Sequence, residues 1–340
     1  MKDKAVTIYD IADKLGLTAS TVSRALQNNT RISEATRQKV ANMAIELGYT
    51  PNYLASSLRK GLAGTIGIVV PRINRNFFSQ VISSIESELD AAGYRIIICQ
   101  SDEKYSKEVD NINALVNLRV DAVAISISME TTEFQHIEKL TAKNIPLVMF
   151  DRVAEQLNVD KVTINDKRGG YDATKHLLHT GCKRIAHLGG SKNISIYKNR
   201  WDGYLEALKD FNIEPNDELM IPDSITQERG FEAVKDLIEK NVAFDGIVAA
   251  GDYAALGALL CLNEHKIKVP EQVKITGFAN EAFTALTNPS LTTVEQFPQE
   301  MGKTVASLLL ERIKHAPDKP YRPKHVIVTP ELLERNSSKK

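Results

Sequence analysis

The chain has 340 residues, of which 43% are hydrophobic, and its 43 basic and 43 acidic side chains give a formal net charge of zero. This composition is typical of a soluble globular protein, and the length suits two or three domains. No apolar run reaches 18 residues and no apolar leader follows Met1, which argues against a membrane protein or an exported one, so we expect a cytoplasmic protein.

Residues 7–26 predict two short helices joined by a tight turn. Thr7 and Asp10 have the spacing of a capping box, and apolar residues then recur on one helix face. Gly16 supplies the turn, and Thr18 can cap the second helix. A third amphipathic helix follows, with Ser33 as its expected N-cap. In a helix-turn-helix of this kind, the second helix enters the major groove of DNA.

An ordinary helical hairpin is the alternative interpretation of this segment. The charge favours DNA binding, because residues 1–60 hold nine basic and five acidic side chains, whereas residues 61–340 hold 34 basic and 38 acidic ones. A positive head on a negative body is typical of a protein that contacts phosphates at one end. We therefore expect a small all-α helix-turn-helix domain that binds double-stranded DNA and places the protein at the nucleoid.

From residue 64 onward, short apolar runs alternate with amphipathic helical segments. Strands are expected at 65–70, 94–99, 122–126, 146–150, 161–164, 184–188, 246–250 and 273–278, and helices at 78–92, 107–118, 169–180, 200–211, 225–239 and 253–264. Such alternation predicts parallel sheets covered by helices on both faces. Two sets of strands predict a two-lobed α/β core that binds its ligand where carboxyl ends of strands meet a cleft.

Three classes of protein fit this organisation: a ligand-responsive DNA-binding regulator, a sugar-binding protein of the transport type, and an enzyme of the doubly wound class. The transport protein leaves the helical head unexplained. The enzyme is not favoured, because the sequence has no dinucleotide-binding glycine motif, phosphate loop or nucleophile elbow, so we expect no catalytic residue and no cofactor. His176 and His179 lack further ligands at metal-binding spacing, so no metal site is expected either.

Several short motifs, taken in order and spacing, resemble those of the LacI/GalR family of bacterial transcription regulators along essentially the whole chain. They are Thr7–Ala12, Ser20–Arg24, Tyr49–Asn52, Val70-Pro71, Phe77-Phe78, Phe150–Arg152, Arg200–Tyr204, Gly277-Phe278 and Leu291–Gln296. The resemblance implies a repressor with a helix-turn-helix domain (1–50), a hinge helix and linker (51–63), and a core like periplasmic sugar-binding proteins (64–340). Within that core it implies an N-terminal lobe (64–163 plus 292–325) and a C-terminal lobe (164–291 plus 326–340).

The same resemblance assigns the positions that contact DNA. On the head these are Thr7, Tyr9, Thr18, Ala19, Ser20, Thr21, Ser23 and Arg24, and on the hinge Asn52, Ala55, Leu58 and Arg59. Arg24 can donate two hydrogen bonds to a guanine edge, and Leu58 stands where the family inserts a leucine into the minor groove. The alternatives are a phosphate or surface role for Arg24 and simple packing for Leu58. Ser56 replaces a basic or amide residue common in the family, and Arg59 is the expected substitute for its phosphate contact.

For the effector, the resemblance points to residues around the cleft of the core. These are Arg75, Phe77, Phe78, Ser126, Asp151, Arg152, Arg200, Asp252, Asn280 and Gln296. Two adjacent phenylalanines can line a sugar ring, although such pairs are also common in hydrophobic cores. Asp151 can hold ring hydroxyls, or it can form a structural salt bridge with an arginine.

Three positions around this cleft depart from the family pattern. Ala279 stands where the family usually has an aspartate, Gly251 where it has an asparagine, and Arg75 where it has another asparagine. These changes remove one carboxylate and one amide from the expected site and add one cation.

The three arginines of the expected site would then converge with only Asp151 opposing them. Guanidinium groups pair bidentately with carboxylates and phosphates, so this arrangement favours an acidic sugar or a sugar phosphate over a neutral sugar. Glu281 or Asp252 could instead neutralise an arginine and restore a site for a neutral sugar.

A homodimer is the expected assembly. One recognition helix covers only a few base pairs, and a two-fold axis doubles the site into a pseudo-palindromic operator. The segment after Val328 lacks sustained apolar heptads, so a tetramer-forming coiled coil is not expected.

Overall fold

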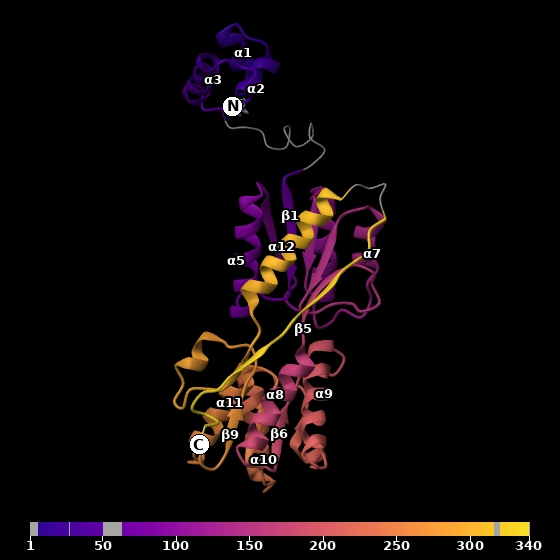
Figure 1. Cartoon of the computed structure of the whole chain (residues 1–340), viewed down its shortest axis with the longest axis vertical. Coiled ribbons are helices and arrows are strands. Elements are labelled where there is room, and N and C mark those ends of the chain that lie inside the picture. Colours follow the sequence, from indigo (N-terminus) through magenta and orange to yellow (C-terminus); the bar gives the residue numbers. More distant parts are fainter. Residues whose placement is uncertain (1–5, 27, 50–62, 316–319, 340) are drawn as a thin grey trace. The chain divides into compact units, whose positions relative to one another are not determined.

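The computed structural model describes residues 6–26, 28–49, 63–315 and 320–339. The chain divides into two compact units, Met1–Ala63 and Gly64–Lys340, which we call the head and the core (Figure 1). None of the helices in these described ranges is long and apolar enough to cross a membrane.

The head consists of α1 (Ile8–Leu15), α2 (Ala19–Leu26) and α3 (Glu34–Glu46) around a small apolar core that includes the fully buried Ile11, Val22 and Val40. The expected start and stop signals are confirmed. The Asp10 carboxylate accepts hydrogen bonds from the backbone N–H and the hydroxyl of Thr7, and Gly16 ends α1 with a φ of 62°. The Ser33 hydroxyl accepts from the Thr36 N–H at the start of α3.

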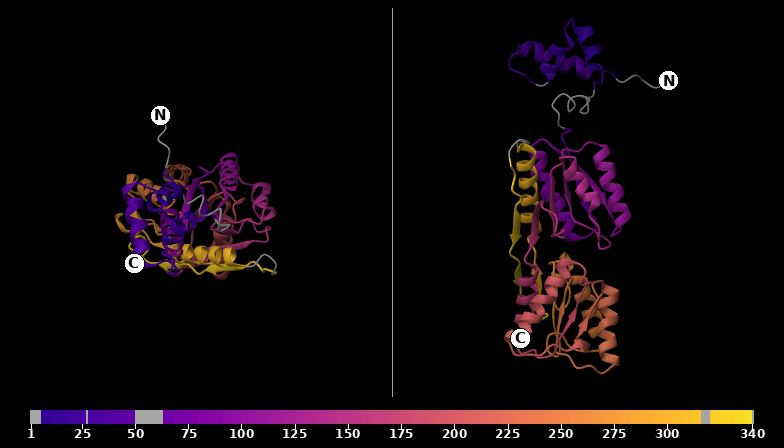
Figure 2. Two further views of the ribbon diagram at one scale, coloured as in Figure 1. Left: turned by 90° about the horizontal axis from the view of Figure 1, so that it is seen from above. Right: turned by 90° about the vertical axis from the view of Figure 1, so that its right-hand side faces the viewer.

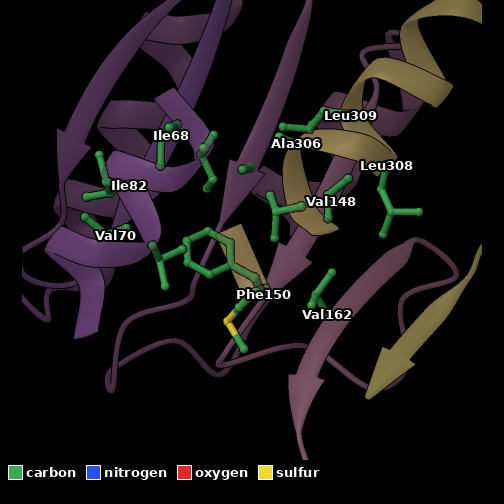
Figure 3. Packing of buried hydrophobic residues seen from close by; sticks show 14 of the residues in the cluster. Ile68, Val70, Ile82, Val148, Phe150, Val162, Ala306, Leu308 and Leu309 are labelled. Atoms are coloured by element: carbon green, nitrogen blue, oxygen red, sulfur yellow. The ribbon is translucent and has the colours of Figure 1, made fainter. Parts of the chain in front are cut away.

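The N-terminal lobe of the core is built on a six-stranded parallel sheet in the order β11-β5-β4-β3-β1-β2. Its strands are β1 (Thr65–Val70), β2 (Arg95–Gln100), β3 (Ala122–Ile125), β4 (Leu147–Phe150), β5 (Asp160–Ile164) and β11 (His325–Val328). Helices α5 (Asn76–Ala91) and α12 (Pro298–Lys314) pack on one face, and α6 (Tyr105–Asn117) and α7 (Gln135–Ala142) on the other. Figure 3 shows the first of these two apolar layers, to which α5 contributes Ile82 and β4 contributes Val148 and Phe150.

The C-terminal lobe repeats this design with a four-stranded parallel sheet in the order β7-β6-β8-β9. Its strands are β6 (Ile185–Leu188), β7 (Met220–Ile221), β8 (Gly246–Ala249) and β9 (Lys274–Thr276). Its helices are α8 (Asp166–His179), α9 (Ser195–Asp210), α10 (Gln227–Glu239) and α11 (Asp252–Glu264), with the short 3-10 turns η1 (Asp217–Leu219) and η2 (Ala282–Ala285). The expected fold of a helical head and a two-lobed α/β core is confirmed.

The two lobes are joined by chain segments that cross between them. Two of these segments, β10 (Thr293–Glu295) and β12 (Glu331–Leu333), form an antiparallel pair, and the yellow C-terminal segment passes from one lobe to the other (Figure 2). The expected lobe boundary at residue 325 is wrong, because β11 pairs with β5 in the N-terminal sheet. The last crossing therefore follows Val328.

Two expected helices begin late by three residues or more, at 169 instead of Asp166 for α8 and at 200 instead of Ser195 for α9. The first turn of α8 is polar, so the apolar periodicity that indicates a helix starts only in its second turn. The first turn of α9 contains the buried Ile196 and Tyr197, which sequence reasoning did not assign to the helix. This difference matters for the site, because Asp166 lies in one of those first turns.

Candidate functional site

Five of the eight predicted DNA-contacting side chains of the head are exposed. Val22 and Ala25 point into the small apolar core, so the other face of α2 is left to polar side chains. Thr18, Ser20 and Arg24 are exposed on that face. The Thr18 hydroxyl accepts from the Thr21 N–H at 3.2 Å and is 2.9 Å from the Ser20 hydroxyl.

The remaining predicted head contacts are Thr7 just before α1 and Tyr9 within it, both exposed, and Ala19, Thr21 and Ser23 in α2, all half-buried. Ala19 packs against the apolar core of the head. These positions stay predictions for contact with DNA. The predicted hinge contacts Asn52, Ala55, Leu58 and Arg59, together with Ser56, lie outside the described residues.

The core holds a cavity of about 250 Å³ with walls from both lobes. Eight of the ten predicted effector residues line it: Arg75, Phe77, Phe78, Asp151, Arg152, Arg200, Asp252 and Gln296. Ser126 and Asn280 do not line it. Sequence reasoning missed several lining residues, among them Arg72, Glu103, Tyr197 and Tyr253.

On the N-terminal wall, Arg152 is held by a carboxylate that the sequence did not suggest. Its Nη1 donates to Oε2 of Glu103 at 2.7 Å, and both side chains are largely buried. The Nε of Arg152 is buried without a hydrogen-bond partner, and Oδ2 of Asp151 lies 4.0 Å from it. Glu103 follows the carboxyl end of β2, the edge where ligands of parallel sheets bind, and this placement was the available signal.

On the C-terminal wall, Arg200 is held from three sides. Its Nε donates to Oδ1 of Asp166 at 2.8 Å, its Nη1 donates to the carbonyl of Ala250 at 2.7 Å, and its guanidinium lies 3.6 Å from the ring centre of Phe278. The helices that carry this pair approach closely, since a Cβ at Gly170 would collide with the backbone of Arg200. Burial raises the pKa of Asp166 to about 6, although Arg200 acts in the opposite direction.

Arg75 reaches the opposite lobe and contacts side chains there. Its guanidinium lies 4.2 Å from the ring centre of Tyr253, at the start of α11, a distance suited to a cation–π contact. Burial raises the pKa of Glu281, whereas the charge of Arg75 and the backbone N–H of Asn76 act in the opposite direction. Arg75 therefore stands beside a carboxylate of the C-terminal lobe.

Ser126 acts on the cavity through its neighbour. Its hydroxyl donates to Oδ2 of Asp151 at 3.2 Å, and Asp151 is held just after β4 in a left-handed conformation with a φ of 58°. Such a φ is uncommon for a residue other than glycine and points to constraint by the surroundings. Burial raises the pKa of Asp151, and the nearby guanidinium groups of Arg152 and Arg200 oppose this effect.

Asp252 fixes the turn that carries Ala279. Its carboxylate accepts from the Thr293 hydroxyl at 2.6 Å and from the Glu281 N–H at 2.8 Å, and burial raises its pKa to about 6. Asn280 points away from the cavity, because its side chain donates to Glu295 at 2.6 Å and accepts from Arg335 at 2.7 Å.

The expectation that only Asp151 opposes the arginines is wrong. The cavity is lined by four arginines, Arg72, Arg75, Arg152 and Arg200, and by four carboxylates, Glu103, Asp151, Asp252 and Glu281. A fifth carboxylate, that of Asp166, pairs with Arg200. The error arose because the partners are 49 and 34 residues apart in the chain and no local pattern joins them.

Among the described residues, no group of three or more histidine, cysteine, aspartate and glutamate side chains is placed to hold a metal ion. His176 instead lies 2.7 Å from the Ser338 hydroxyl, at Nε2, and His179 packs edge-on against Phe211.

Comparison with known proteins agrees with both units. Residues 63–335 match the family model described as periplasmic binding proteins and sugar binding domain of the LacI family, and residues 7–52 match that of bacterial regulatory proteins, lacI family. The chain is 35% identical to the HTH-type transcriptional regulator DegA of Bacillus subtilis (strain 168), over 87% of this chain and 88% of that protein.

Two further comparisons cover almost the whole chain. The HTH-type transcriptional repressor PurR of Vibrio atlanticus (strain LGP32) is 33% identical over 98% of each protein. The solved structure of a transcriptional regulator CelR–cellobiose complex is similar with a TM-score of 0.74 and 26% identity, covering 98% of this chain and 99% of that one.

Proposed function

The chain belongs to the lacI family of bacterial regulatory proteins, and we propose that it is a homodimeric repressor whose operator affinity is set by a neutral, hydroxyl-rich ligand in the cavity. The head binds DNA as in other helix-turn-helix regulators of this family, and the core binds the effector. A regulator that acts on operator DNA works at the nucleoid, which is where we place this one.

The charge pairing inside the cavity is the observation that carries the ligand class. Arg152 and Arg200 already have carboxylate partners at 2.7 and 2.8 Å, so neither needs an anionic ligand to compensate its charge. An added carboxylate or phosphate would also stand beside the lining carboxylates. A neutral ligand avoids both costs, because buried charges are tolerated when they are paired.

Hydroxyl groups suit the remaining chemistry of the cavity. Asp151 and Gln296 offer hydrogen-bonding groups with little exposure to solvent, and the Nε of Arg152 is a donor that still lacks an acceptor. The rings of Phe77 and Phe78 meet at a 75° angle beside them and offer an apolar surface for the face of a sugar ring. The similarity to a regulator solved with cellobiose supports the carbohydrate class.

A dimer on a pseudo-palindromic operator follows from the size of α2 (Ala19–Leu26), which can contact only a few base pairs in one major groove. Selection from random duplexes, followed by titration of the winning sequence with and without neutral sugars, tests the proposal. We expect a two-fold symmetric site and a change of at least tenfold in its affinity on addition of one such sugar. Enrichment of no sequence at all would contradict DNA recognition.

Asp151→Asn serves as the matched variant in this titration. The substitution lies in the core and replaces a cavity carboxylate with an amide of nearly the same size. In the absence of ligand, the variant should therefore bind the operator as tightly as wild type. Its response to the sugar should weaken, because the amide changes the hydrogen-bonding pattern offered to hydroxyls. An unchanged response would place the effector elsewhere.

A further inference from the structure

We infer that Glu103 determines the charge class of the ligand by holding the guanidinium of Arg152, so that anions are excluded from the cavity; this deepens the proposed function and rests on the cavity being the effector site. Glu103 lies in the loop after β2 and lines the cavity. Its role is that of a specificity-determining residue, distinct from the groups that hold ligand hydroxyls.

Arg152 depends on Glu103 for its one close charge partner among the described residues. The two side chains are 9% and 14% exposed, and Nη1 lies 2.7 Å from Oε2. Asp151 is farther away, at 4.0 Å from Nε, and its carboxylate already accepts from the Ser126 hydroxyl. Loss of Glu103 would therefore leave a largely buried cation without a close anion, and a ligand anion could take that place.

The loop that presents Glu103 is fixed in an unusual conformation. Asp102 and Glu103 have φ values of 60° and 63°, so two successive residues other than glycine are left-handed. Contacts on both sides hold this turn: Asp102 forms ion pairs with Arg72 at 3.2 Å and Lys107 at 3.0 Å, and Glu103 accepts from the Met129 N–H at 3.0 Å. The backbone of this turn is therefore constrained, and the Met129 N–H and Arg152 Nη1 both hold Oε2 of Glu103 in place.

Arg200 shows why the effect should be specific to Arg152. Its guanidinium already contacts Asp166, the carbonyl of Ala250 and the ring of Phe278, so Nε, Nη1 and one face of the group already have partners. Arg152 keeps one unpartnered Nε in the buried site. After removal of the Glu103 charge, Nη1 also loses its acceptor, and a ligand oxyanion can accept from Nη1 in the place of the Glu103 carboxylate.

The test measures binding of inorganic phosphate to the full chain by calorimetry, with chloride added to keep the ionic strength constant. Wild type should bind phosphate weakly. Glu103→Gln should bind it at least about tenfold more tightly, since a charge-assisted hydrogen bond gained in a buried site is of that order. Glu103→Asp, whose shorter carboxylate cannot reach Arg152 as well, should show a smaller gain and covers the case in which the glutamine variant fails to fold.

Two controls decide the interpretation. Glu130→Gln removes a carboxylate that pairs with Lys104 on the same side of the lobe at 2.6 Å but outside the cavity lining, and it should leave phosphate binding at the wild-type level. Glu103→Gln combined with Arg152→Gln should lose the gain. Wild-type phosphate affinity in both Glu103 variants, or a gain that survives in the double variant, would overturn the inference. The measurement uses no operator and no sugar. A protein that failed to bind operator or sugar would therefore not, for that reason alone, give either of these two results.

Discussion

The head and the core hold their polar side chains in different ways. In the head, the bonds Thr7–Asp10, Thr18–Thr21 and Ser33–Thr36 join residues three positions apart, and all are exposed. In the cavity, the arginines pair with carboxylates 49 and 34 residues away, and these pairs are largely buried.

These two kinds of pairing suit different functions of the two units. The polar surface of the head forms wherever its three helices form, so it can meet DNA without help from a ligand. The charge pattern of the cavity exists only when distant segments of the core are assembled. The affinity of a ligand for the cavity therefore depends on how these segments are arranged. Exposed local pairs contribute little to stability, whereas breaking a buried pair is costly.

The largest expected effect comes from Asp166→Ala, which leaves the buried guanidinium of Arg200 without its carboxylate. Removal of one partner of a buried pair typically destabilises a protein by about 3–5 kcal/mol. Urea unfolding followed by the fluorescence of Trp201, the one tryptophan of the chain, reports on the core. Asp202→Ala, which breaks the exposed pair with Lys198, should cost less than about 0.5 kcal/mol. Equal costs for the two variants would contradict the contrast between buried and exposed pairs.

Arg24→Ala tests the head. Loss of a guanidinium from a base edge should weaken operator binding by about 1–3 kcal/mol and relax the sequence preference at one symmetric position. Unfolding monitored at Trp201 should not change. Arg229→Ala, an exposed arginine of the core helix α10, is the matched control and should leave operator binding intact. An equal loss on the operator and on unrelated DNA would make Arg24 a phosphate contact instead.

Asp252 gives the core a pH dependence. Its pKa is about 6 in the folded protein against an ordinary 3.8, so its contribution to stability is complete below the lower value and is lost as pH rises through the higher one. The unfolding free energy of wild type minus that of Asp252→Asn should therefore fall between pH 4 and pH 6, by at most about 1.4 kcal/mol per pH unit. Asp236→Asn makes the same change from carboxylate to amide on the exposed side of α10, and it is the control for the substitution itself. A difference that is flat over this range would show that burial does not raise the pKa.

The smallest expected effect is in the head. Ser33→Ala removes the hydroxyl that accepts from the Thr36 N–H at the start of α3, which typically costs about 1 kcal/mol. Amide hydrogen exchange in α3 should speed up accordingly, while exchange in the core stays unchanged. Gln38→Ala, an exposed residue of the same helix, should have little effect. Equal changes in both variants would remove Ser33 as the cap.

The head was the more predictable unit because its signals are local. Thr7, Gly16 and Ser33 are helix start and stop residues whose partners lie within a few positions, so spacing alone indicated them. Eight of the twelve strands in the described part of the core were found to within a few residues for the same reason, whereas the short strands β7, β10, β11 and β12 were not predicted. The pairing of Arg152 with Glu103, and of Arg200 with Asp166, depends on which loops and helix ends the fold brings together, and the polar first turn of α8 hid Asp166 from an argument based on apolar periodicity.

Calorimetry with matched ligands tests the charge-paired cavity most directly. Neutral mono- and disaccharides would be titrated into the full chain beside the uronic acids and sugar phosphates derived from them, and each binder would then be added to the operator complex. We predict that a neutral sugar binds more tightly than its anionic derivatives, stabilises the core by about 2.7 kcal/mol at a hundred times its Kd, and changes operator affinity. Tighter binding of the anionic member of the same pair, with the operator response following it, would contradict a cavity whose arginines are already neutralised.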